Sequence, residues 1–434
     1  MKKRQQQKIR RELFTGDNLD IMRGMDTACV DMIYLDPPFN SGKNWGGDRP
    51  IGVKKKTSKA TTSKASFSDV WKLSDVRMSE HSLLERDAPK LYSVIDALHA
   101  VNGGSWKAYL TYMGMRLLEM RRILKPEGCI FYHCDPVMSH GIKLVMDAVF
   151  GKTNFRNEIV WRKYAGRKNN AKHKLSTQHD CIFLYGASDE AGIIPLFIPH
   201  SAEEIEREYK YTTPAGRRYR KSRGRNYQLT GEEKRIYLDK SPGRAVGTLW
   251  VEDGLQLNTS AQERVGYPTQ KPLSLLERII KLASNKDDLV LDPFCGCATT
   301  CVAAERLDRQ WIGIDISEVA ADIVMRRLND ETVFMDKTYV RHRTDIPLRS
   351  DSPPPSKDIK IRLYGRQGGF CNGCGNHFYA ENLEIDHIIP RAAGGRDTDV
   401  NLQLLCNYCN RVKGDRDMAY LFSKLRKTGK WKLR

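Results

Sequence analysis

Residues 289–300 read Leu-Val-Leu-Asp-Pro-Phe-Cys-Gly-Cys-Ala-Thr-Thr, an apolar run that leads into a turn of small residues and then into a helical pattern. Gly296 lacks a side chain, so a ligand could approach this turn closely, and the amino end of the next helix offers unpaired N–H groups. Asp315 ends the next apolar run, 23 positions after Asp292, near the usual offset for an acid that binds ribose hydroxyls. The stretch therefore predicts a nucleotide-binding turn, although the same pattern is also typical of tight packing alone.

The apolar pattern on both sides of this stretch predicts strands that alternate with helices. Short buried runs predict strands within 28–39 and at 129–133, 289–291 and 311–314, and helical spacing predicts helices at 106–124, 142–150, 273–283 and 299–307. Strands that alternate with helices are typical of a parallel sheet covered on both faces. We therefore expect an α/β fold with a doubly wound, Rossmann-like sheet.

The charge balance favours a polyanionic partner. The 434 residues include 72 Lys and Arg against 53 Asp and Glu, a formal charge of +19, and 40% of them are apolar. That apolar share excludes a wholly disordered chain, and no run approaches the roughly 18 apolar residues that span a bilayer. The amino terminus has no apolar stretch of the secretory type, so we expect a cytoplasmic protein with no membrane partner. The charge favours nucleic acid, with plain solubility as the alternative.

Length and linkers divide the chain into two or three domains. Ser352-Pro-Pro-Pro-Ser356 is typical of a stiff linker, and it predicts a first domain over 1–350, a linker over 351–358 and a second domain over 359–434. A Lys-rich stretch between Ser41 and Ser68 predicts a mobile loop. The irregular stretch of about 190–262 is crowded with basic residues, among them Arg217, Arg218, Arg220, Lys221, Arg223 and Arg225.

Asp36-Pro37-Pro38-Phe39 directly follows the first buried run. The two prolines fix the backbone, so the Asp36 carboxylate and the Pro37 carbonyl could both accept hydrogen bonds from one amino group. Phe39 would supply a flat face against which a base can stack. Two acceptors beside an aromatic ring suit an extruded nucleobase whose amine attacks a methyl donor. The alternative is a proline-rich turn that only ends a strand.

Asp36-Pro37-Pro38-Phe39 and Asp292-Pro293-Phe294-Cys295-Gly296 together resemble the catalytic and S-adenosylmethionine motifs of DNA amino-methyltransferases. The catalytic motif comes first along the chain, which is similar to the circularly permuted β class of that family. Thr15-Gly16-Asp17 and Tyr267-Pro268-Thr269-Gln270-Lys271-Pro272 agree with the same resemblance, which extends over most of 13–320.

The resemblance implies a permuted Rossmann-like methyltransferase that uses S-adenosylmethionine and acts on double-stranded DNA. It places Asp292, Pro293, Phe294 and Gly296 at the methionine portion of the cofactor, Asp315 at its ribose, Asp17 at its adenine side, and Thr269, Gln270 and Lys271 at the pocket entrance. Asp36, Pro37, Pro38 and Phe39 would be catalytic. The stretch of about 190–262 would be the target-recognition region.

Two details of the resemblance bear on specificity and on the shape of the pocket. An Asp at the head of the catalytic motif favours N6 of adenine, and N4 of cytosine stays open. The turn reads Gly296-Cys297-Ala298 where the family has Gly-Ser-Gly. We expect Ala298 to be tolerated there if its φ is negative.

Four cysteines near the carboxyl end form two Cys-x-x-Cys pairs, Cys371 with Cys374 and Cys406 with Cys409. Four thiolates in this spacing are typical of structural Zn²⁺, and a closed set of four ligands leaves no catalytic position. A segment this short has little core, so metal binding would supply much of its folding free energy.

Between and after the cysteine pairs lie Asp386-His387, Asn401 and Asn410-x-x-Lys413, a pattern that resembles the HNH nucleases and their small ββα-metal fold. The resemblance implies that His387 takes a proton from the attacking water, and that Asp386 and Asn410 offer oxygen ligands to Mg²⁺ or Mn²⁺. Asn401 would brace the loop that holds His387. Together the two resemblances favour a restriction–modification or phage-defence enzyme. The alternative is a zinc module that only binds DNA, and a homodimer stays open.

Overall fold

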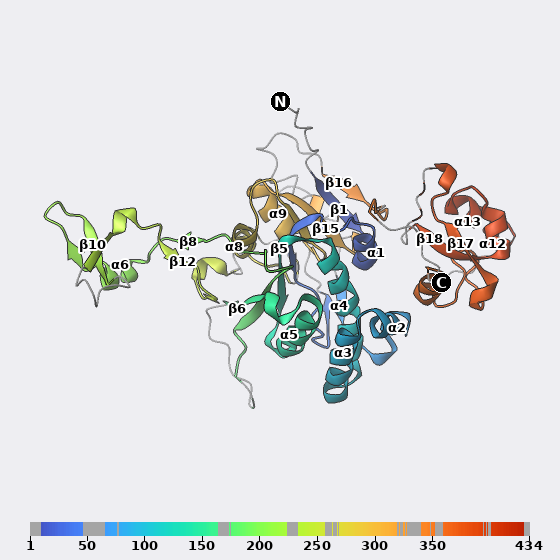
Figure 1. Cartoon of the computed structure of the whole chain (residues 1–434), viewed down its shortest axis with the longest axis horizontal. Coiled ribbons are helices and arrows are strands. Elements are labelled where there is room, and N and C mark those ends of the chain that lie inside the picture. The colour runs from blue at the N-terminus through green and yellow to red at the C-terminus, as the bar shows by residue number, and fades with distance from the viewer. Residues whose placement is uncertain are drawn as a thin grey trace, which may run out of the picture. The chain divides into compact units, whose positions relative to one another are not determined.

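The computed structural model describes residues 10–46, 66–75, 78–163, 173, 175–223, 233–256, 263, 267, 269–318, 321, 324–325, 327, 340–347, 349–351, 359–393, 395, 397 and 401–428. The chain forms two compact units, Met1–Gly192 with Trp250–Arg434, and Ile193–Leu249 (Figure 1). Most of the Lys-rich stretch and of the Pro-rich linker lies outside the described residues, as does Arg225.

A nine-stranded sheet forms the centre of the first unit, in the order β13-β6-β7-β5-β2-β14-β15-β1-β16. Its strands are β1 (Arg11–Thr15), β2 (Val30–Leu35), β5 (Leu124–Cys134), β6 (Phe155–Arg162), β7 (His179–Gly186), β13 (Leu249–Trp250), β14 (Leu289–Asp292), β15 (Gln310–Asp315) and β16 (Arg341–Arg343). In this spatial order the six neighbouring strands β5, β2, β14, β15, β1 and β16 run parallel to one another. β7 runs antiparallel to both β5 and β6. The predicted α/β sheet is confirmed.

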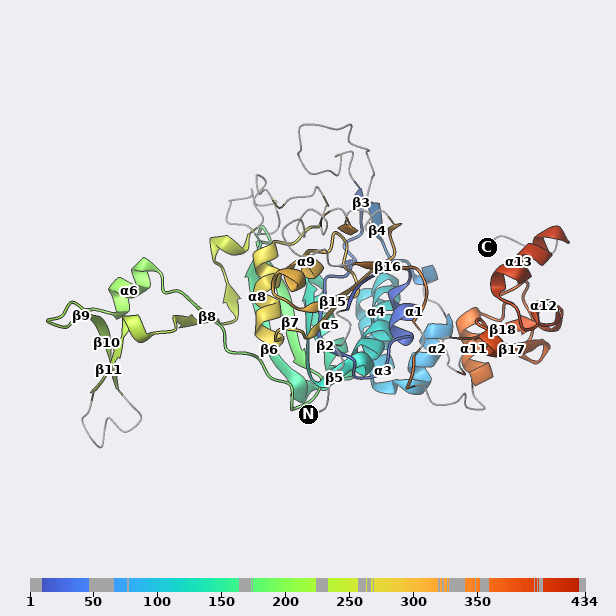
Figure 2. The same ribbon diagram turned by 90° about the horizontal axis from the view of Figure 1, so that it is seen from above.

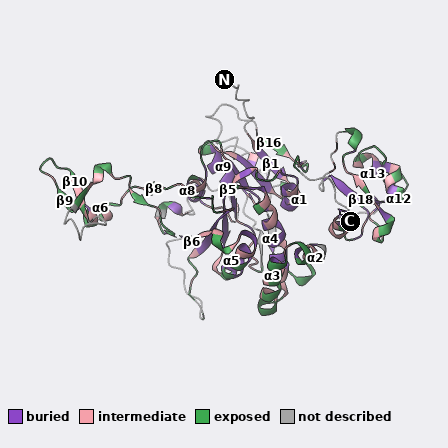
Figure 3. Cartoon of the chain, in the orientation of Figure 1, coloured by how far each residue is buried: buried purple, intermediate pink, exposed green. Residues whose placement is uncertain are grey.

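Helices cover both faces of this sheet (Figure 2). On one face lie α1 (Asn18–Arg23), α3 (Pro89–Asn102), α4 (Gly104–Ile123) and α5 (Pro136–Phe150), with α2 (Met78–Asp87) beside them, and on the other lie α8 (Leu273–Ala283) and α9 (Thr299–Arg306). Leu289 and Leu291 of β14 belong to the core on the α4 and α5 side, so the buried Val290 between them points to the opposite face. The strands are therefore buried from both sides (Figure 3).

β5 and α5 begin at least five residues earlier than the sequence predicts, whereas α8 has the predicted bounds. β5 starts at Leu124 rather than at 129, because Leu124 already pairs with Val30 of β2. α5 starts at Pro136 rather than at 142, because the Asp135 carboxylate accepts hydrogen bonds from two backbone N–H groups of its first turn. None of the helices in the described part of the chain is long and apolar enough to cross a membrane.

The unit Ile193–Leu249 falls within the stretch of about 190–262 that the sequence singles out. Its described elements are β8 (Phe197–Ile198), α6 (Ala202–Glu208), β9 (Tyr211–Thr212), β10 (Arg218–Arg223), β11 (Glu233–Tyr237) and β12 (Arg244–Ala245). β10 pairs antiparallel with β9 and with β11, which aligns Tyr211, Tyr219 and Tyr237 in one row. Arg217 and Arg235 lie over rings of this row, at 4.3 and 5.1 Å from the ring centroids.

The carboxyl-terminal residues form a small module with a core of its own. Its elements are α11 (Ile359–Gln367), β17 (Leu383–His387), β18 (Leu402–Cys406), α12 (Asn407–Lys413) and α13 (Met418–Lys427). β17 and β18 pair antiparallel, and α12 follows β18 directly. This order, two strands and then a helix, confirms the predicted ββα arrangement.

Candidate active site and metal centre

Four acids lie at one edge of the central sheet, where β2, β14, β15 and β1 end. Asp292 and Asp315 close β14 and β15, and Asp36 and Asp17 follow β2 and β1 within two residues. These four strands are neighbours and run parallel, so their carboxyl ends meet at the same edge. Residues that are up to 298 positions apart in the sequence thereby come together.

Asp292 holds the turn that leads from β14 into α9. Its carboxylate accepts hydrogen bonds from the N–H of Phe294 at 3.0 Å and from the Thr300 hydroxyl at 2.5 Å. Burial raises the pKa of Asp292 from 3.8 to about 7, although both hydrogen bonds oppose the shift. Gly296 has a φ of +50°, and a Cβ there would lie 3.2 Å from the Tyr267 ring. Only glycine fits this position without strain.

Ala298 takes a left-handed conformation, with a φ of +55°. The condition under which we expect this alanine to be tolerated, a negative φ, is therefore not met. The turn sets the conformation, because the Ala298 N–H bonds the Cys295 carbonyl at 2.6 Å and the Ala298 carbonyl accepts the first hydrogen bond of α9. An alanine in this region costs about 1–2 kcal/mol relative to right-handed backbone, which explains why a glycine is favoured at this point of the turn.

Asp315 and Asp17 both accept backbone hydrogen bonds at the ends of their strands. Asp315 accepts from the N–H groups of Gly296 and Ser317, both at 2.9 Å, and burial raises its pKa. Asp17 caps α1 by accepting from the N–H of Leu19 at 2.9 Å. Asp315 thus ties the end of β15 to the turn after β14.

Arg116, an almost fully buried residue of α4, connects Asp17 to the same turn. Its guanidinium donates to Asp17 and to the side-chain oxygen of Asn18, each at 2.6 Å. Asn18 in turn donates to the Pro293 carbonyl at 2.7 Å. The chain of contacts holds the ends of β1 and β14 together.

Asp36 lies beside Lys271, which reaches it from the segment before α8. The Lys271 ammonium donates to Oδ2 of Asp36, whereas Oδ1 is buried and has no hydrogen-bond partner among the described residues. Thr269 and Gln270 are half-buried next to Lys271, and Gln270 donates to the Glu263 carbonyl at 2.7 Å. Lys271 therefore contacts the proposed catalytic motif itself as well as lying near its entrance.

Phe39 stacks on His133, with ring centroids 6.1 Å apart and planes inclined by 25°. His133 is fully buried and is held by the Tyr34 hydroxyl at 2.9 Å and by Asp180 at 3.3 Å. Burial would raise the pKa of Asp180, but the hydrogen bond and charge of His133 and the nearby Lys163 lower it to about 2. Pro37 is buried and Pro38 half-buried at the turn that precedes Phe39. A rigid stack thus supports one face of Phe39.

Asp69, the last residue of β4 (Ser66–Asp69), holds the loop that follows Phe39. Its buried carboxylate accepts hydrogen bonds from the backbone N–H groups of Phe39, Asn40 and Ser41 and from the Ser41 hydroxyl. β4 pairs with β3 (Lys43–Gly46), which continues from the same loop. Asp69 therefore fixes the exit of the catalytic motif.

Sequence reasoning missed Asp69, Asn18, Arg116 and His133. Asp69 lies 30 positions after Phe39 with the Lys-rich stretch between them, so spacing gave no signal. The sequence offered one cue, the position of Arg116 within a predicted helix of mostly apolar residues. An arginine there predicts a partner for its charge, because arginine is rarely buried without one.

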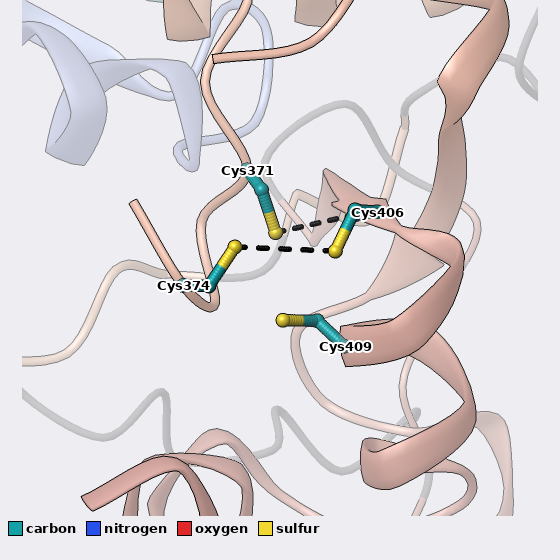
Figure 4. A group of neighbouring side chains, drawn as sticks. All are labelled: Cys371, Cys374, Cys406 and Cys409. Carbon is teal, nitrogen blue, oxygen red and sulfur yellow. Dashed lines mark hydrogen bonds between the residues drawn. The ribbon is translucent and has the colours of Figure 1, made fainter. Parts of the chain in front are cut away.

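The four cysteines of the carboxyl-terminal module converge, as Figure 4 shows. All four are buried, and their sulfur atoms lie within 4.8 Å of one another, with 3.9 Å between Cys374 and Cys406. Tetrahedral Zn²⁺ with bonds of about 2.3 Å separates its sulfur ligands by about 3.8 Å, so this set fits the ion. A Cβ at Gly373 would lie 2.8 Å from the Cys409 sulfur, so the first knuckle requires glycine. The hydrogen bond between Cys371 and Cys409 lowers the pKa of Cys371 and raises that of Cys409.

His387 and Asn401 lie at one end of β17. His387 Nε2 is 2.6 Å from an oxygen of Asp397, which also pairs with Arg391 at 2.6 Å. Asn401 is buried, and its side chain makes two hydrogen bonds with the backbone of Ile389, at 2.8 and 3.0 Å. Asn401 thus fixes the backbone two residues beyond His387.

Asp386 and Glu384 point from β17 toward α12. The buried Lys413 lies 3.1 Å from Asp386, which also accepts from Gln403 at 2.8 Å, and Asn410 donates to Glu384 at 2.6 Å. Carboxylate and amide oxygens are the ligands that Mg²⁺ prefers, so Asp386 and Asn410 are of the right chemical type, although Lys413 and Gln403 already contact the Asp386 carboxylate. Sequence reasoning named Lys413 as part of a motif but gave it no role, and it missed Glu384 and Asp397, although strand alternation places Glu384 on the side of Asp386.

Comparison with known proteins identifies relatives of both parts. Residues 30–326 match the model of a family described as DNA methylase, and residues 371–416 match that of the HNH endonucleases. Type II methyltransferase M.EcaI of Enterobacter cloacae is 31% identical over 287 residues, which cover 56% of this chain and 62% of that protein. The Mod subunit of the type III restriction-modification enzyme StyLTI of Salmonella typhimurium is 26% identical over 413 residues, which cover 81% of this chain and 59% of that subunit.

The chain thus spans about three fifths of the length of these two curated relatives. Among solved structures, the M1.HpyAVI–SAM complex is similar at a TM-score of 0.38 and 18% identity, and the match covers 73% of this chain and 98% of that one.

Proposed function

The chain belongs to the N6/N4 DNA methylase family and carries an HNH endonuclease domain, and from this premise we propose that it methylates N6 of adenine in double-stranded DNA. The observation that carries the proposal is the Asp36 carboxylate, which has one buried oxygen without a partner among the described residues. A buried acceptor of this kind costs free energy until a donor reaches it, and an exocyclic amine is such a donor. N4 of cytosine is the second candidate, because its amine offers a similar edge.

In this proposal the catalytic motif binds the target amine through two hydrogen-bond acceptors. Asp36 and the Pro37 carbonyl accept its two N–H hydrogens, and Phe39, supported on one side by His133, offers its other face to the extruded base. The amine would keep its protons while its nitrogen attacks the methyl group, since orienting its lone pair is the main requirement. The bond from that methyl to the cofactor sulfur would break, and the extra proton on the methylated nitrogen would pass to the Asp36 carboxylate. Pro38 keeps the turn rigid between the acceptors and the ring.

S-adenosylmethionine would supply the electrophilic methyl group. Asp292, Pro293, Phe294 and Gly296 would hold its methionine portion, Asp315 its ribose and Asp17 its adenine side, with Thr269, Gln270 and Lys271 at the entrance. The turn after β14 fits such a ligand, because Gly296 leaves its backbone open and Asp315 is already oriented by two backbone N–H groups.

For the carboxyl-terminal domain we propose metal-dependent cleavage of DNA. His387 would take the proton of the attacking water, helped by its contact with Asp397, and Asp386 and Asn410 would hold Mg²⁺ or Mn²⁺. Cys371, Cys374, Cys406 and Cys409 would hold Zn²⁺ as a structural ion. The alternative is a module that binds DNA without cutting it.

The proposed domain limits are 1–350 for the methyltransferase, 351–358 for the linker and 359–434 for the nuclease, with target recognition at about 190–262. The basic and tyrosine-rich face of Ile193–Leu249 supports contact with DNA there, because such side chains bind phosphates and stack on bases. The two activities together would mark one DNA and cut another.

The decisive experiment is sequencing, with detection of modified bases, of DNA from cells that express the His387→Ala protein. We expect N6-methyladenine in one sequence context, and no such mark in cells that express His387→Ala with Asp36→Ala. N4-methylcytosine instead would select the second candidate. Purified Asp36→Ala protein should lose about 100-fold in methylation rate, so a near-normal rate would show that Asp36 is not the acceptor.

A further inference from the structure

We propose that Lys271 is a positioning residue for the catalytic carboxylate: its ammonium holds Oδ2 of Asp36, so that Oδ1 faces the target amine. The proposal rests on the proposed methyltransferase function and assigns to Lys271 a role other than lining the cofactor entrance. Asp36 and Lys271 are 235 residues apart in the sequence and meet only because β2 ends beside the segment that precedes α8.

The contact between Lys271 and Asp36 is enclosed. The two side chains are 13% and 15% exposed, so water competes little for either charge. The same ammonium lies 3.4 Å from the Thr269 carbonyl and 5.8 Å from the centroid of the Phe39 ring. Asp36 and Phe39 both belong to the proposed catalytic motif, so Lys271 is held against that motif from the side of α8.

Orientation follows from how the two oxygens of Asp36 are used. A carboxylate can turn about its Cβ–Cγ bond, and a donor fixed on one oxygen removes that freedom. Lys271 occupies Oδ2, whereas Oδ1 is buried and has no partner among the described residues. The remaining oxygen is thus fixed in orientation and desolvated before a base arrives, and an acceptor for an amine requires both.

The charges around Asp36 explain why a cation is needed at this point. Asp292 of β14 and Asp315 of β15 lie at the same edge, and burial raises the pKa of both. Like charges gathered in an enclosed site repel one another, so a cation placed among them offsets that repulsion. Lys271 is that cation for Asp36.

Lys271→Met and Lys271→Arg test the proposal, with Lys281→Met as a matched control. Lys281 lies on α8 with 43% of its side chain exposed, and its carboxylate contact, to Glu277, is 4.0 Å long. For each protein we would measure single-turnover methylation of unmethylated DNA with saturating tritiated S-adenosylmethionine. Calorimetry would give the Kd for the cofactor, and a filter assay the Kd for DNA.

We expect Lys271→Met to slow methylation by about 100-fold, the size of effect seen when one oriented group is removed from a reacting centre. The Kd for S-adenosylmethionine should stay within about threefold of the wild type, since Lys271 acts on Asp36 and not on the cofactor. Lys271→Arg should recover the rate to within about tenfold, because a guanidinium can also donate to Oδ2. Lys281→Met should behave as the wild type.

Two results would overturn the role of Lys271. One is an unchanged methylation rate in Lys271→Met. The other is a loss of cofactor affinity of more than tenfold with a normal rate at saturation, which would make Lys271 a cofactor residue. Unchanged cofactor binding also shows that the variant is folded. A wild-type protein that methylates no DNA would instead refute the proposed function, so the two failures are distinguishable.

Discussion

Replacing Asp69 with asparagine should loosen the loop behind the catalytic motif without touching either substrate. The Asp69 carboxylate is 2% exposed and accepts four hydrogen bonds. Oδ2 takes the N–H groups of Phe39 at 3.3 Å and Ser41 at 2.9 Å and the Ser41 hydroxyl at 2.6 Å, and Oδ1 takes the N–H of Asn40 at 2.7 Å. Asn40 has a φ of +56°, so this loop is held in a strained shape.

The magnitude follows from how an amide would fit among these donors. The side-chain oxygen of the new asparagine would take the position of Oδ2, which accepts from three donors. Its NH₂ group would then replace Oδ1 and face the N–H of Asn40, which is also a donor. One charge-assisted hydrogen bond is lost, at about 1.5–3 kcal/mol, and the others weaken because the acceptor is no longer ionised. We therefore expect a total loss of about 3 kcal/mol, shared between folding and the placement of Phe39 in the transition state.

The assay compares Asp69→Asn with Asp75→Asn, whose carboxylate is exposed and accepts from the N–H of Lys72 at 2.7 Å. Methylation under single-turnover conditions should fall by about 30- to 100-fold in Asp69→Asn, at 1.4 kcal/mol for each factor of ten, and should be unchanged in Asp75→Asn. Cofactor affinity should stay normal in both. The reasoning would be refuted if the methylation rate of Asp69→Asn stayed within twofold of the wild type and its unfolding free energy stayed within about 0.5 kcal/mol.

Three further predictions concern other parts of the chain. Because burial raises the pKa of Asp292 to about 7, its stabilising contribution is full below about pH 4 and is lost as the pH rises through 7. Urea titrations at several pH values between about 4 and 7 would measure this loss. In that range the unfolding free energy of the wild type should fall by up to about 1.4 kcal/mol per pH unit relative to that of Asp292→Asn. Cys374→Ser, or a chelator, should unfold the carboxyl-terminal module, seen as loss of bound zinc and of protection from proteolysis at 359–428. His387→Ala should abolish Mg²⁺-dependent nicking and leave methylation intact, and loss of both activities together would contradict separate sites.

Local patterns predicted those parts of the fold in which neighbouring residues decide the structure. The apolar spacing of α8 gave its bounds, and the run from Leu289 to Thr300 gave the strand, turn and helix that carry the cofactor motif. The start of β5 could not be predicted in this way, because it depends on pairing with Val30, almost a hundred residues earlier. The condition stated for Ala298, a negative φ, is not met for a different reason, since the hydrogen bonds of the local turn set that angle.

The motifs predicted which residues gather at the candidate site, but not the contacts that they make there. Parallel strands bring their ends together by topology, so Asp36 and Asp292 could be expected at one edge. The partner of a side chain depends on distances of a few ångströms between elements far apart in sequence. Two such contacts are the ion pair of Lys271 with Asp36 and the hydrogen bond from the Phe39 N–H to Asp69. The spacing of apolar residues along the sequence does not encode them.

The proposed site gathers acids although the chain as a whole is basic, and this constrains how DNA could enter. The chain carries a formal charge of +19, yet the sheet edge gathers acids from four neighbouring strands. Two of these acids, Asp36 and Asp17, are paired with Lys271 and Arg116, so these two cations are already engaged and are not available to phosphates. In the proposed function the DNA backbone would then be held by basic side chains elsewhere, such as those over the tyrosine row of Ile193–Leu249. The part of the DNA that reaches Asp36 would be an extruded base, which the sugar separates from its phosphates.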